Sequence, residues 1–282
     1  MVELGLHNPL AAALGAKGES EMVLAKQVLS AQPAQSLLIN DRYYGVPELL
    51  VGLPAERKRH FLVRVRKNLT RRLLAVYPDG SALVEIRSGQ ATRLVREILG
   101  RVQRGGRGPA TTVRLWTSLL DWRRCPAAEV LALYARRWEQ EVFYKELKVD
   151  MRSTPCLQSH TPLTAMQEIA ALILAYAVLV DYRLEAATVG GVGVLRISFM
   201  KTLQVVQGLW QFLEVSADLL TPAQVRLVVR RSLRRIADMA IPKRRQRSCP
   251  RALRQPVSSW PRLRKNTHRN GPIQYSIGEI YG

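Results

Sequence analysis

The segment YARRWEQEVFYKELK, Tyr134 to Lys148, combines carboxylates, cations and aromatic side chains within what its spacing predicts to be one long helix. Each residue of an α-helix advances by about 100°, which places four of these side chains in one stripe about 60° wide. The four residues are Tyr134, Arg137, Glu141 and Lys148. A carboxylate can hold Mg²⁺, and Tyr, Arg and Lys donors can hold neighbouring phosphates. The stripe therefore suits phosphodiester chemistry. The alternative is an exposed helix whose ion pairs contribute only a few tenths of a kcal/mol.

A second carboxylate is needed for metal-assisted phosphodiester chemistry, and Asp41 is the candidate. It directly follows SLLIN, a short apolar segment that predicts a buried strand. Ligands of open α/β sheets lie at the carboxyl ends of strands. Arg42, Tyr43 and Tyr44 add hydrogen-bond donors beside this acid. The alternative interpretation of Asp41 is an aspartate that only forms a turn or caps a helix.

The charge of the chain favours an anionic partner. The 282 residues carry a formal net charge of +21, and such a basic surface attracts phosphate backbones, so nucleic acid is the expected partner. An anionic membrane surface and a merely basic structural or RNA-binding protein are the alternatives. Cys125, Cys156 and Cys249 are widely separated, which argues against a disulfide framework or zinc site and fits a reducing cytoplasm.

Strands and helices alternate in the first part of the chain, which predicts an α/β layer fold. The expected strands are MVELGL, SLLIN and HFLVRVRKN. Between them, SEMVLAKQVLSAQ predicts a helix capped by Ser20, and VPELLVGL predicts a helix with Pro47 in its first turn. Residues 1–69 are therefore expected to form the first part of the core.

A β-rich insertion is expected over residues 70–122. Alternating segments on both sides of Pro78–Gly80 predict a hairpin, TTVRLWTSLLD predicts a further strand, and GGRGP at 105–109 predicts a flexible loop. Residues 123–185 are then expected to return to the core as helices. The apolar run Ile169–Val180 is too short to span a bilayer and predicts a buried helix.

Residues 186–282 are expected to form a helical C-terminal region, with a helix near 194–215, followed by a basic tail. From Arg226 to Arg269 the chain holds fifteen Lys or Arg residues and one acid, Asp238. The part from Lys243 to Arg269 is rich in proline and cations, so we expect an extended arm there. It either binds DNA without sequence preference or makes no fixed contact.

The four spaced residues resemble a known signature. Tyr134, Arg137, Glu141 and Lys148 match the Y-(2)-R-(3)-E-(6)-K pattern of insertion-sequence DDE transposases of the IS-four type. LLINDRYYGVPELL similarly resembles the second-aspartate region of that family, and HFLVRVRKN, VRLWTSLLD and LYARRWEQEVFYKELK follow in the family's order. The resemblance runs from near the N-terminus to about Asp181 and more loosely through the basic tail.

The resemblance implies a ribonuclease H-like core with a β-rich insertion, in which three acids hold two Mg²⁺ (or Mn²⁺) ions. Water attacks the transposon end, and the released 3′-hydroxyl then attacks another phosphodiester. By this resemblance Asp41 is the second acid and Glu141 the third. Three further residues are implied to contact phosphates: Tyr134, Arg137 and Lys148. The implied setting is a homodimer on paired DNA ends in the bacterial cytoplasm and nucleoid, with no membrane.

The family's first aspartate has no counterpart in this sequence. No Asp precedes Asp41, and the upstream acids are Glu3, Glu19 and Glu21, of which Glu3 falls on a strand that resembles a later one. We therefore expect an N-terminally truncated or split-frame transposase with little or no activity alone. The alternative is a non-catalytic DNA-binding inhibitor or regulator of transposition. Lys145 is a further candidate for the phosphate-binding stripe, whereas Asp150 is expected to be a solvated helix-end residue.

Overall fold

The computed structural model describes residues 1–15, 18–54, 56–103, 111–152, 156–242, 247–248, 269–270 and 274–278. The chain divides into two compact units. The helical unit comprises Met1–Gln32 and Trp138–Arg244, and the sheet unit comprises Pro33–Arg137 and Arg245–Gly282.

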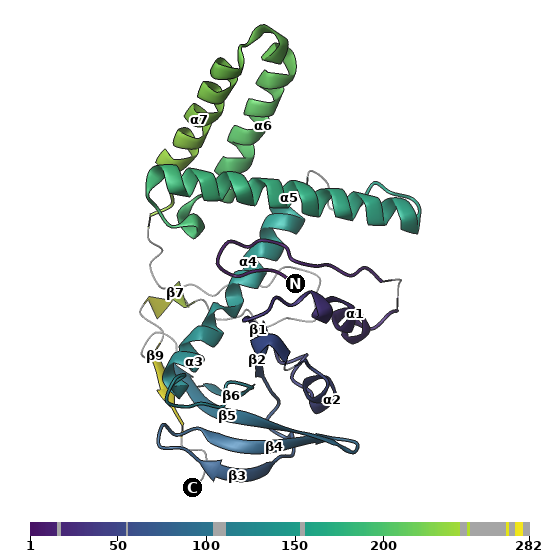
Figure 1. The fold of residues 1–282 in the computed structure, drawn as a ribbon, viewed down its shortest axis with the longest axis vertical. Coiled ribbons are helices and arrows are strands. Elements are labelled where there is room, and N and C mark those ends of the chain that lie inside the picture. Colours follow the sequence, from purple (N-terminus) through teal and green to yellow (C-terminus); the bar gives the residue numbers. More distant parts are fainter. Residues whose placement is uncertain are drawn as a thin grey trace. The chain divides into compact units, whose positions relative to one another are not determined.

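The sheet unit is built on one mixed sheet of seven strands (Figure 1). Its strands are β1 (Leu37–Asn40), β2 (His60–Arg64), β3 (Arg72–Val76), β4 (Ala82–Ser88), β5 (Ala91–Gln103), β6 (Thr111–Thr117) and β9 (Gln274–Ile277). The order is β1-β2-β6-β5-β4-β3, and β9 also pairs with β5. β1 and β2 are parallel, whereas the other pairs are antiparallel. The expected α/β class is confirmed.

Helix α3 (Ala127–Ala135) packs on this sheet because β5 carries a glycine at the contact. A Cβ atom on Gly100 would lie 2.5 Å from the methyl groups of Leu131, so only glycine allows this approach. Leu131 and Val130 pack there with buried residues of three strands, including Leu62, Ile98 and Leu115. Tyr134 lies against this cluster, so the core fixes the helix that carries it. The sheet unit also contains α2 (Pro47–Val51) and the 3-10 turn η2 (Glu56–Lys58).

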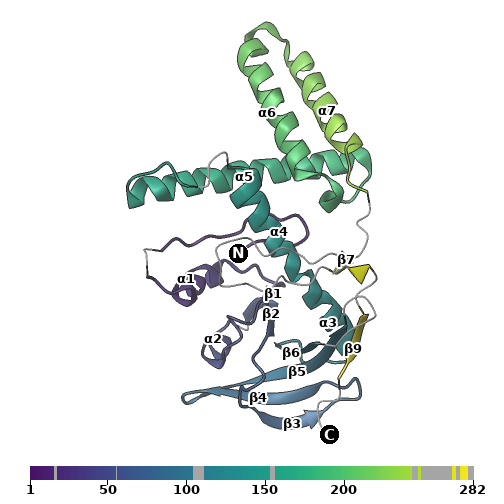
Figure 2. The ribbon, with the colours of Figure 1, turned by 180° about the vertical axis from the view of Figure 1, so that it is seen from behind.

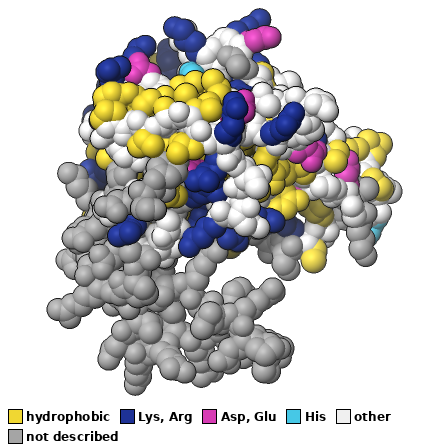
Figure 3. Space-filling view, turned by 90° about the horizontal axis from the view of Figure 1, so that it is seen from below, with side chains coloured by type: hydrophobic (Ala, Val, Ile, Leu, Met, Phe, Trp, Pro, Cys, Tyr) yellow, Lys and Arg dark blue, Asp and Glu magenta, His cyan; other side chains and the backbone are white. Residues whose placement is uncertain are grey.

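The edge strand β3 is exposed along its whole length. Leu73, Leu74 and Val76 show large exposed fractions, which is unusual for apolar residues of a strand. Figure 3 views the molecule from the β3 end of Figure 1 and shows apolar and basic side chains side by side on that face. Basic residues on an edge strand oppose pairing with a second sheet edge.

The helical unit contains α1, α4, α5, α6 and α7, with short 3-10 and π-helical segments between them (Figure 2). Its elements are α1 (Glu21–Val28), η1 (Leu29–Ala31), α4 (Glu139–Lys145), the π-helix η4 (Glu146–Asp150), α5 (Pro162–Gly190), η5 (Val194–Arg196), α6 (Phe199–Ser216), η6 (Ala217–Leu219) and α7 (Pro222–Asp238). Tyr176, Phe199 and Ile236 lie in its core. The 3-10 turn η3 (Arg136–Trp138) contains the boundary between the two units.

Several predicted elements are confirmed by the structure. Ser20 caps α1, Pro47 begins α2, and β1 ends directly before Asp41. The predicted hairpin joins β3 to β4, with Gly80 at a φ of 77° that favours glycine. The loop expected at 105–109 lies outside the described residues.

Three predictions differ from the structure. MVELGL is a turn with an isolated bridge between Val2 and Pro9, because the Glu3 carboxylate accepts hydrogen bonds from the amides of Gly5 and Leu6. Helix α7 (Pro222–Asp238) covers the first part of the basic stretch that begins at Arg226. The arm expected over 243–269 falls almost wholly outside the described residues. The single long helix predicted to contain Tyr134 to Lys148 is also wrong, because η3 and η4 interrupt it.

Helix α5 is only partly the buried helix that was expected. It is 29 residues long, and only 17% of its most apolar 18-residue window is buried. Length and composition alone would allow it to cross a membrane, which is weak evidence because core helices of soluble proteins meet the same criteria. Its other side carries Tyr176 and Arg183, which are buried in the helical unit.

Candidate active site

Asp41 lies at the carboxyl end of β1, as the sequence predicted. The side chain is half-buried, and its Oδ1 accepts a hydrogen bond of 2.8 Å from the Tyr43 amide. Asp41 therefore also forms the turn that was its alternative interpretation. Asn40 pairs with Val63 in the parallel β2, so Asp41 and Arg64 follow paired positions at the same edge of the sheet.

Tyr134 lies close to Asp41 within the sheet unit. Tyr134 lies in the last turn of α3 and Arg137 in η3, three residues further on, and Arg137 donates a hydrogen bond to the Tyr134 hydroxyl. Burial raises the pKa of Tyr134; the positive charges of Arg137 and Arg64 oppose this shift, and the negative charge of Asp41 reinforces it. Four charged or hydrogen-bonding groups thus gather at the sheet edge. They are Asp41, Arg64, Tyr134 and Arg137.

Glu141 and Lys148 belong to the helical unit and are both exposed. Glu141 lies on α4, whereas Lys148 lies in η4 with its ammonium 4.6 Å from the centre of the Tyr144 ring. The rotation of 100° per residue does not hold through η3 and η4, so the regular stripe predicted from the sequence is not formed. The convergence of Asp41 with Glu141 stays a prediction.

The described residues fit a metal site only in part. They include no group of three or more His, Cys, Asp or Glu residues placed to hold a metal ion. Asp41 is nevertheless a suitable ligand. Its Oδ2 has no hydrogen-bond partner in the described part of the chain, and carboxylate oxygens are ligands that Mg²⁺ prefers. Glu141 adds a second accessible carboxylate.

A basic pocket of about 380 Å³ lies beside this sheet edge and was not predicted from the sequence. It is lined by Arg42, Arg64, Val65, Arg66, Lys67, Asn68, Thr112 and Arg114, five of which are cationic and none acidic. The Arg114 guanidinium shapes one wall, because its Nη1 donates hydrogen bonds to the carbonyls of Lys67 (2.9 Å) and Leu69 (3.2 Å). The alternation of HFLVRVRKN, with Arg64 and Arg66 two residues apart, was the signal that could have revealed it.

A buried polar cluster joins α4 and η4 to the N-terminal segment. His7 is 1% exposed; its Nε2 lies 3.0 Å from Glu139 Oε2 and its Nδ1 lies 3.2 Å from Glu146 Oε2. Burial alone would lower the pKa of His7, but its hydrogen bonds to both carboxylates outweigh burial and raise it. Both ring nitrogens face acceptors, so the imidazolium is the form that satisfies both contacts.

We expect His7 to make stability depend on pH. Because its pKa is raised on folding, its stabilisation is complete below the unfolded-state pKa of about 6.5 and is lost as pH rises through the folded-state pKa. Urea unfolding of wild type and His7→Gln at pH values from about 5.5 to 9 measures this effect. The difference between the two chains should shrink as pH rises. A difference that is constant or grows with pH would contradict the assignment.

Sequence comparisons identify the family of the chain. A family model described as "Transposase DDE domain" matches residues 1–178, which is more than half of the chain. Transposase InsG for insertion sequence element IS4 of Escherichia coli (strain K12) is 28% identical over 278 residues. The alignment covers 94% of this chain and 61% of InsG, so the chain spans about three fifths of the length of that relative. The resemblance inferred from the sequence is confirmed: the chain belongs to the DDE-domain transposase family.

Proposed function

We propose that this chain acts in cut-and-paste DNA transposition as the part of an IS4-type transposase that holds and cleaves insertion-sequence ends. The observation that carries this proposal is the grouping of Asp41, Tyr134, Arg137 and Arg64 at one sheet edge, next to a pocket lined by five cations. Carboxylates, a phenol and guanidinium groups are the side chains that phosphodiester cleavage requires. The core is proposed to be ribonuclease H-like, and its partner is DNA.

Each residue has a defined task in this proposal. Asp41 and Glu141 hold divalent metal ions, Mg²⁺ or Mn²⁺; when bound, such ions neutralise the scissile phosphate and activate the attacking oxygen. Arg137 binds a phosphate oxygen near the cleavage point. Tyr134 is protonated at neutral pH, as an ordinary tyrosine is, and burial raises its pKa further, so its hydroxyl can donate a hydrogen bond to a phosphate. Lys148 adds a further phosphate contact.

The basic pocket extends this phosphate-binding surface along the DNA backbone. Contacts of Lys and Arg with phosphates fix the register of a duplex without reading its sequence. A homodimer on paired ends in the bacterial cytoplasm and nucleoid completes the proposal.

A non-catalytic DNA-binding regulator is the second candidate function. It is favoured by the carboxylates of the described residues, which include no group of three or more His, Cys, Asp or Glu placed to hold a metal ion. A metal site with one missing carboxylate binds and positions its ions poorly. We therefore expect the purified chain to show little or no strand transfer with labelled DNA ends and Mg²⁺. Clear Mg²⁺-dependent end cleavage would contradict this expectation and favour the catalytic function.

Separate replacement of Lys148 and Glu141 tests the phosphate-binding role of the first and the metal-binding role of the second. Lys148→Ala removes one phosphate contact, so the affinity of this variant for a short blunt-ended duplex should fall about tenfold at 0.1 M salt. The slope of log affinity against log salt concentration should become shallower by about one. Glu141→Ala should leave binding unchanged, because Glu141 is assigned to metal and not to phosphate. Fluorescence anisotropy at several salt concentrations measures both. Equal losses in the two variants would contradict the assigned roles.

A further inference from the structure

The helix that carries Glu141 changes pitch immediately before Lys148. After α4, residues Glu146–Asp150 form a π-helix, closed by a 3.0 Å hydrogen bond from the Met151 amide to the Glu146 carbonyl. Such turns are rare and frequently occur at functional sites. In an α-helix, residues five apart point about 140° away from each other. Here Lys145 and Asp150 form an ion pair of 2.7 Å across the turn. Asp150 is therefore not the solvated residue that the sequence suggested, whereas phosphate binding by Lys145 stays a prediction.

Glu146 anchors the inner side of this π-turn. Glu146 is 6% exposed, and one oxygen of its carboxylate faces donors from two separate segments, the N-terminal segment and α5. Oε2 accepts hydrogen bonds from the Tyr176 hydroxyl (2.6 Å), His7 Nδ1 (3.2 Å) and Arg183 Nη1 (3.4 Å). The hydrogen bonds from His7 and Tyr176 and the charge of Arg183 lower the pKa of Glu146 despite its burial, which by itself raises it. A buried charge with these partners is held in one position.

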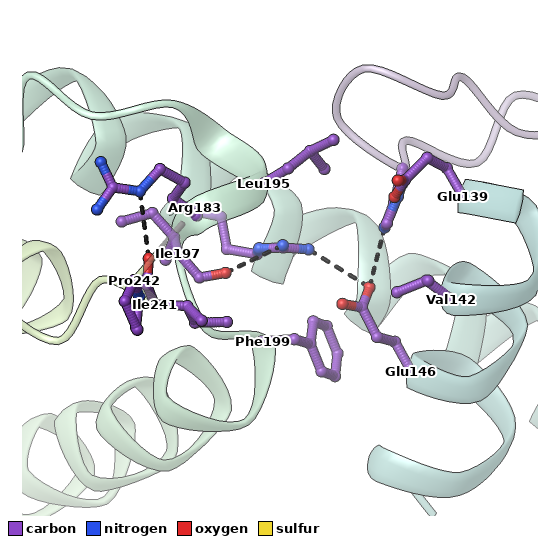
Figure 4. A pocket seen from close by; sticks show the side chains of 11 residues that line it. Glu139, Val142, Glu146, Arg183, Leu195, Ile197, Phe199, Ile241 and Pro242 are labelled. Atoms are coloured by element: carbon purple, nitrogen blue, oxygen red, sulfur yellow. Dashed lines mark hydrogen bonds and ion pairs between the residues drawn. The ribbon is translucent and has the colours of Figure 1, made fainter. Parts of the chain in front are cut away.

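The network extends beyond the turn itself. Figure 4 shows the Arg183 guanidinium between the Glu146 carboxylate and the Ile197 backbone, and Arg183 Nη2 donates a 3.1 Å hydrogen bond to the Ile197 carbonyl. These groups line a pocket of about 160 Å³ together with Glu139 and Phe199. Glu146 thereby ties η4 to α5 and to the segment that follows α5.

Lys148 lies two residues after Glu146, on the exposed side of the same turn. Its ammonium lies 4.6 Å from the centre of the Tyr144 ring, a cation-π contact that further confines it. We propose that Glu146 is the positioning residue for Lys148: it fixes the π-turn from inside the unit, so that the Lys148 ammonium is presented to a DNA phosphate. Glu146 itself is too deeply buried to touch DNA. The inference rests on the proposed DNA-binding function.

A double-mutant cycle on DNA affinity tests this coupling. The background variant is Glu146→Gln, which keeps the volume and one acceptor for Tyr176 but removes the charge that holds His7 and Arg183. Glu146→Gln alone should weaken binding to a short blunt-ended duplex by up to about tenfold. Adding Lys148→Ala to this variant should not lower the affinity further. In the wild-type background Lys148→Ala should cost its full tenfold. Far-UV circular dichroism confirms that each variant is folded.

Two further variants keep the test decisive. Tyr176→Phe removes the shortest hydrogen bond to Glu146 and keeps the ring, so it should reduce the cost of Lys148→Ala even if Glu146→Gln does not fold. Glu168→Gln is the matched control. It removes a carboxylate of the same unit that binds the 158–159 loop, and it should leave the cost of Lys148→Ala at tenfold.

The possible outcomes separate the two claims. One outcome is that Lys148→Ala lowers DNA affinity by the same factor in the wild-type chain and in all three variant backgrounds, Glu146→Gln, Tyr176→Phe and Glu168→Gln. In that case Glu146 is only a structural anchor and the inference is overturned, whereas DNA binding by Lys148 stands. If Lys148→Ala costs nothing in the wild-type chain, the phosphate contact of Lys148 is wrong and the inference fails with it.

Discussion

Replacing Glu97 by alanine is expected to lower the free energy of unfolding of the sheet unit by about 3–5 kcal/mol, because it leaves a buried cation without its partner. Glu97 is fully buried on β5; its Oε2 accepts hydrogen bonds from Arg114 Nε (2.5 Å) and Trp116 Nε1 (2.8 Å). Its Oε1 accepts a third, from Arg71 (3.2 Å). Arg114 is only 6% exposed, so water cannot replace the lost carboxylate.

Urea unfolding followed by far-UV circular dichroism measures this loss, and hydrogen exchange of β5 and β6 amides locates it in the sheet unit. Glu85→Ala is the matched control on the neighbouring strand β4. Its ion pair with Arg72 is largely exposed, so the loss should be about 0–1 kcal/mol. A Glu97→Ala loss no larger than that of Glu85→Ala would show that the buried network does not stabilise the sheet.

Removing Arg66 and Lys67 together is expected to produce the largest loss of DNA affinity. Both residues are exposed and line the basic pocket. Arg114 Nη1 donates hydrogen bonds to the backbone carbonyls of both. Loss of two phosphate contacts should weaken binding to a short duplex on the order of 50-fold at 0.1 M salt. The slope of log affinity against log salt concentration should become shallower by about two. Fluorescence anisotropy from about 0.05 to 0.3 M salt measures both quantities.

A variant with the same net charge separates the pocket from the general charge of the chain. Lys58→Ala with Arg87→Ala also removes two exposed cations of the sheet unit, but neither residue lines the pocket. It should change affinity much less than the Arg66 and Lys67 pair. Equal losses would mean that net charge, and not this pocket, governs binding.

The parts of the fold that were predictable have local causes. SLLIN forms a strand because an apolar run is followed at once by turn residues, and Asp41 therefore lies at its end. The hairpin after β3 follows from Gly80, whose positive φ closes the turn between Tyr77 and Ser81. Tyr134 and Arg137 meet because they are three residues apart on either kind of helix.

The parts that were missed depend on distant contacts. The π-turn at Glu146 is anchored by His7, 139 residues away, and by Arg183, 37 residues away, so no local pattern encodes it. MVELGL alternates like a strand, but the Glu3 carboxylate satisfies nearby amides and produces a turn.

Helix α7 did have a local signal. Thr221 and Gln224 form a capping box, and Pro222 between them occupies the first helical position. The many arginines of the segment made its apolar face hard to recognise from the sequence.

Iron-mediated backbone cleavage tests most directly whether Asp41 and Glu141 share a divalent metal ion. Fe²⁺ replaces Mg²⁺ at carboxylate sites, and with ascorbate and peroxide it cuts the polypeptide near the bound metal. For the chain bound to a DNA end, we expect cuts next to both Asp41 and Glu141, and loss of both sets of cuts in Asp41→Asn and in Glu141→Gln alike. Cuts at only one of the two residues, or cuts near Glu141 that persist in Asp41→Asn, would contradict the shared site.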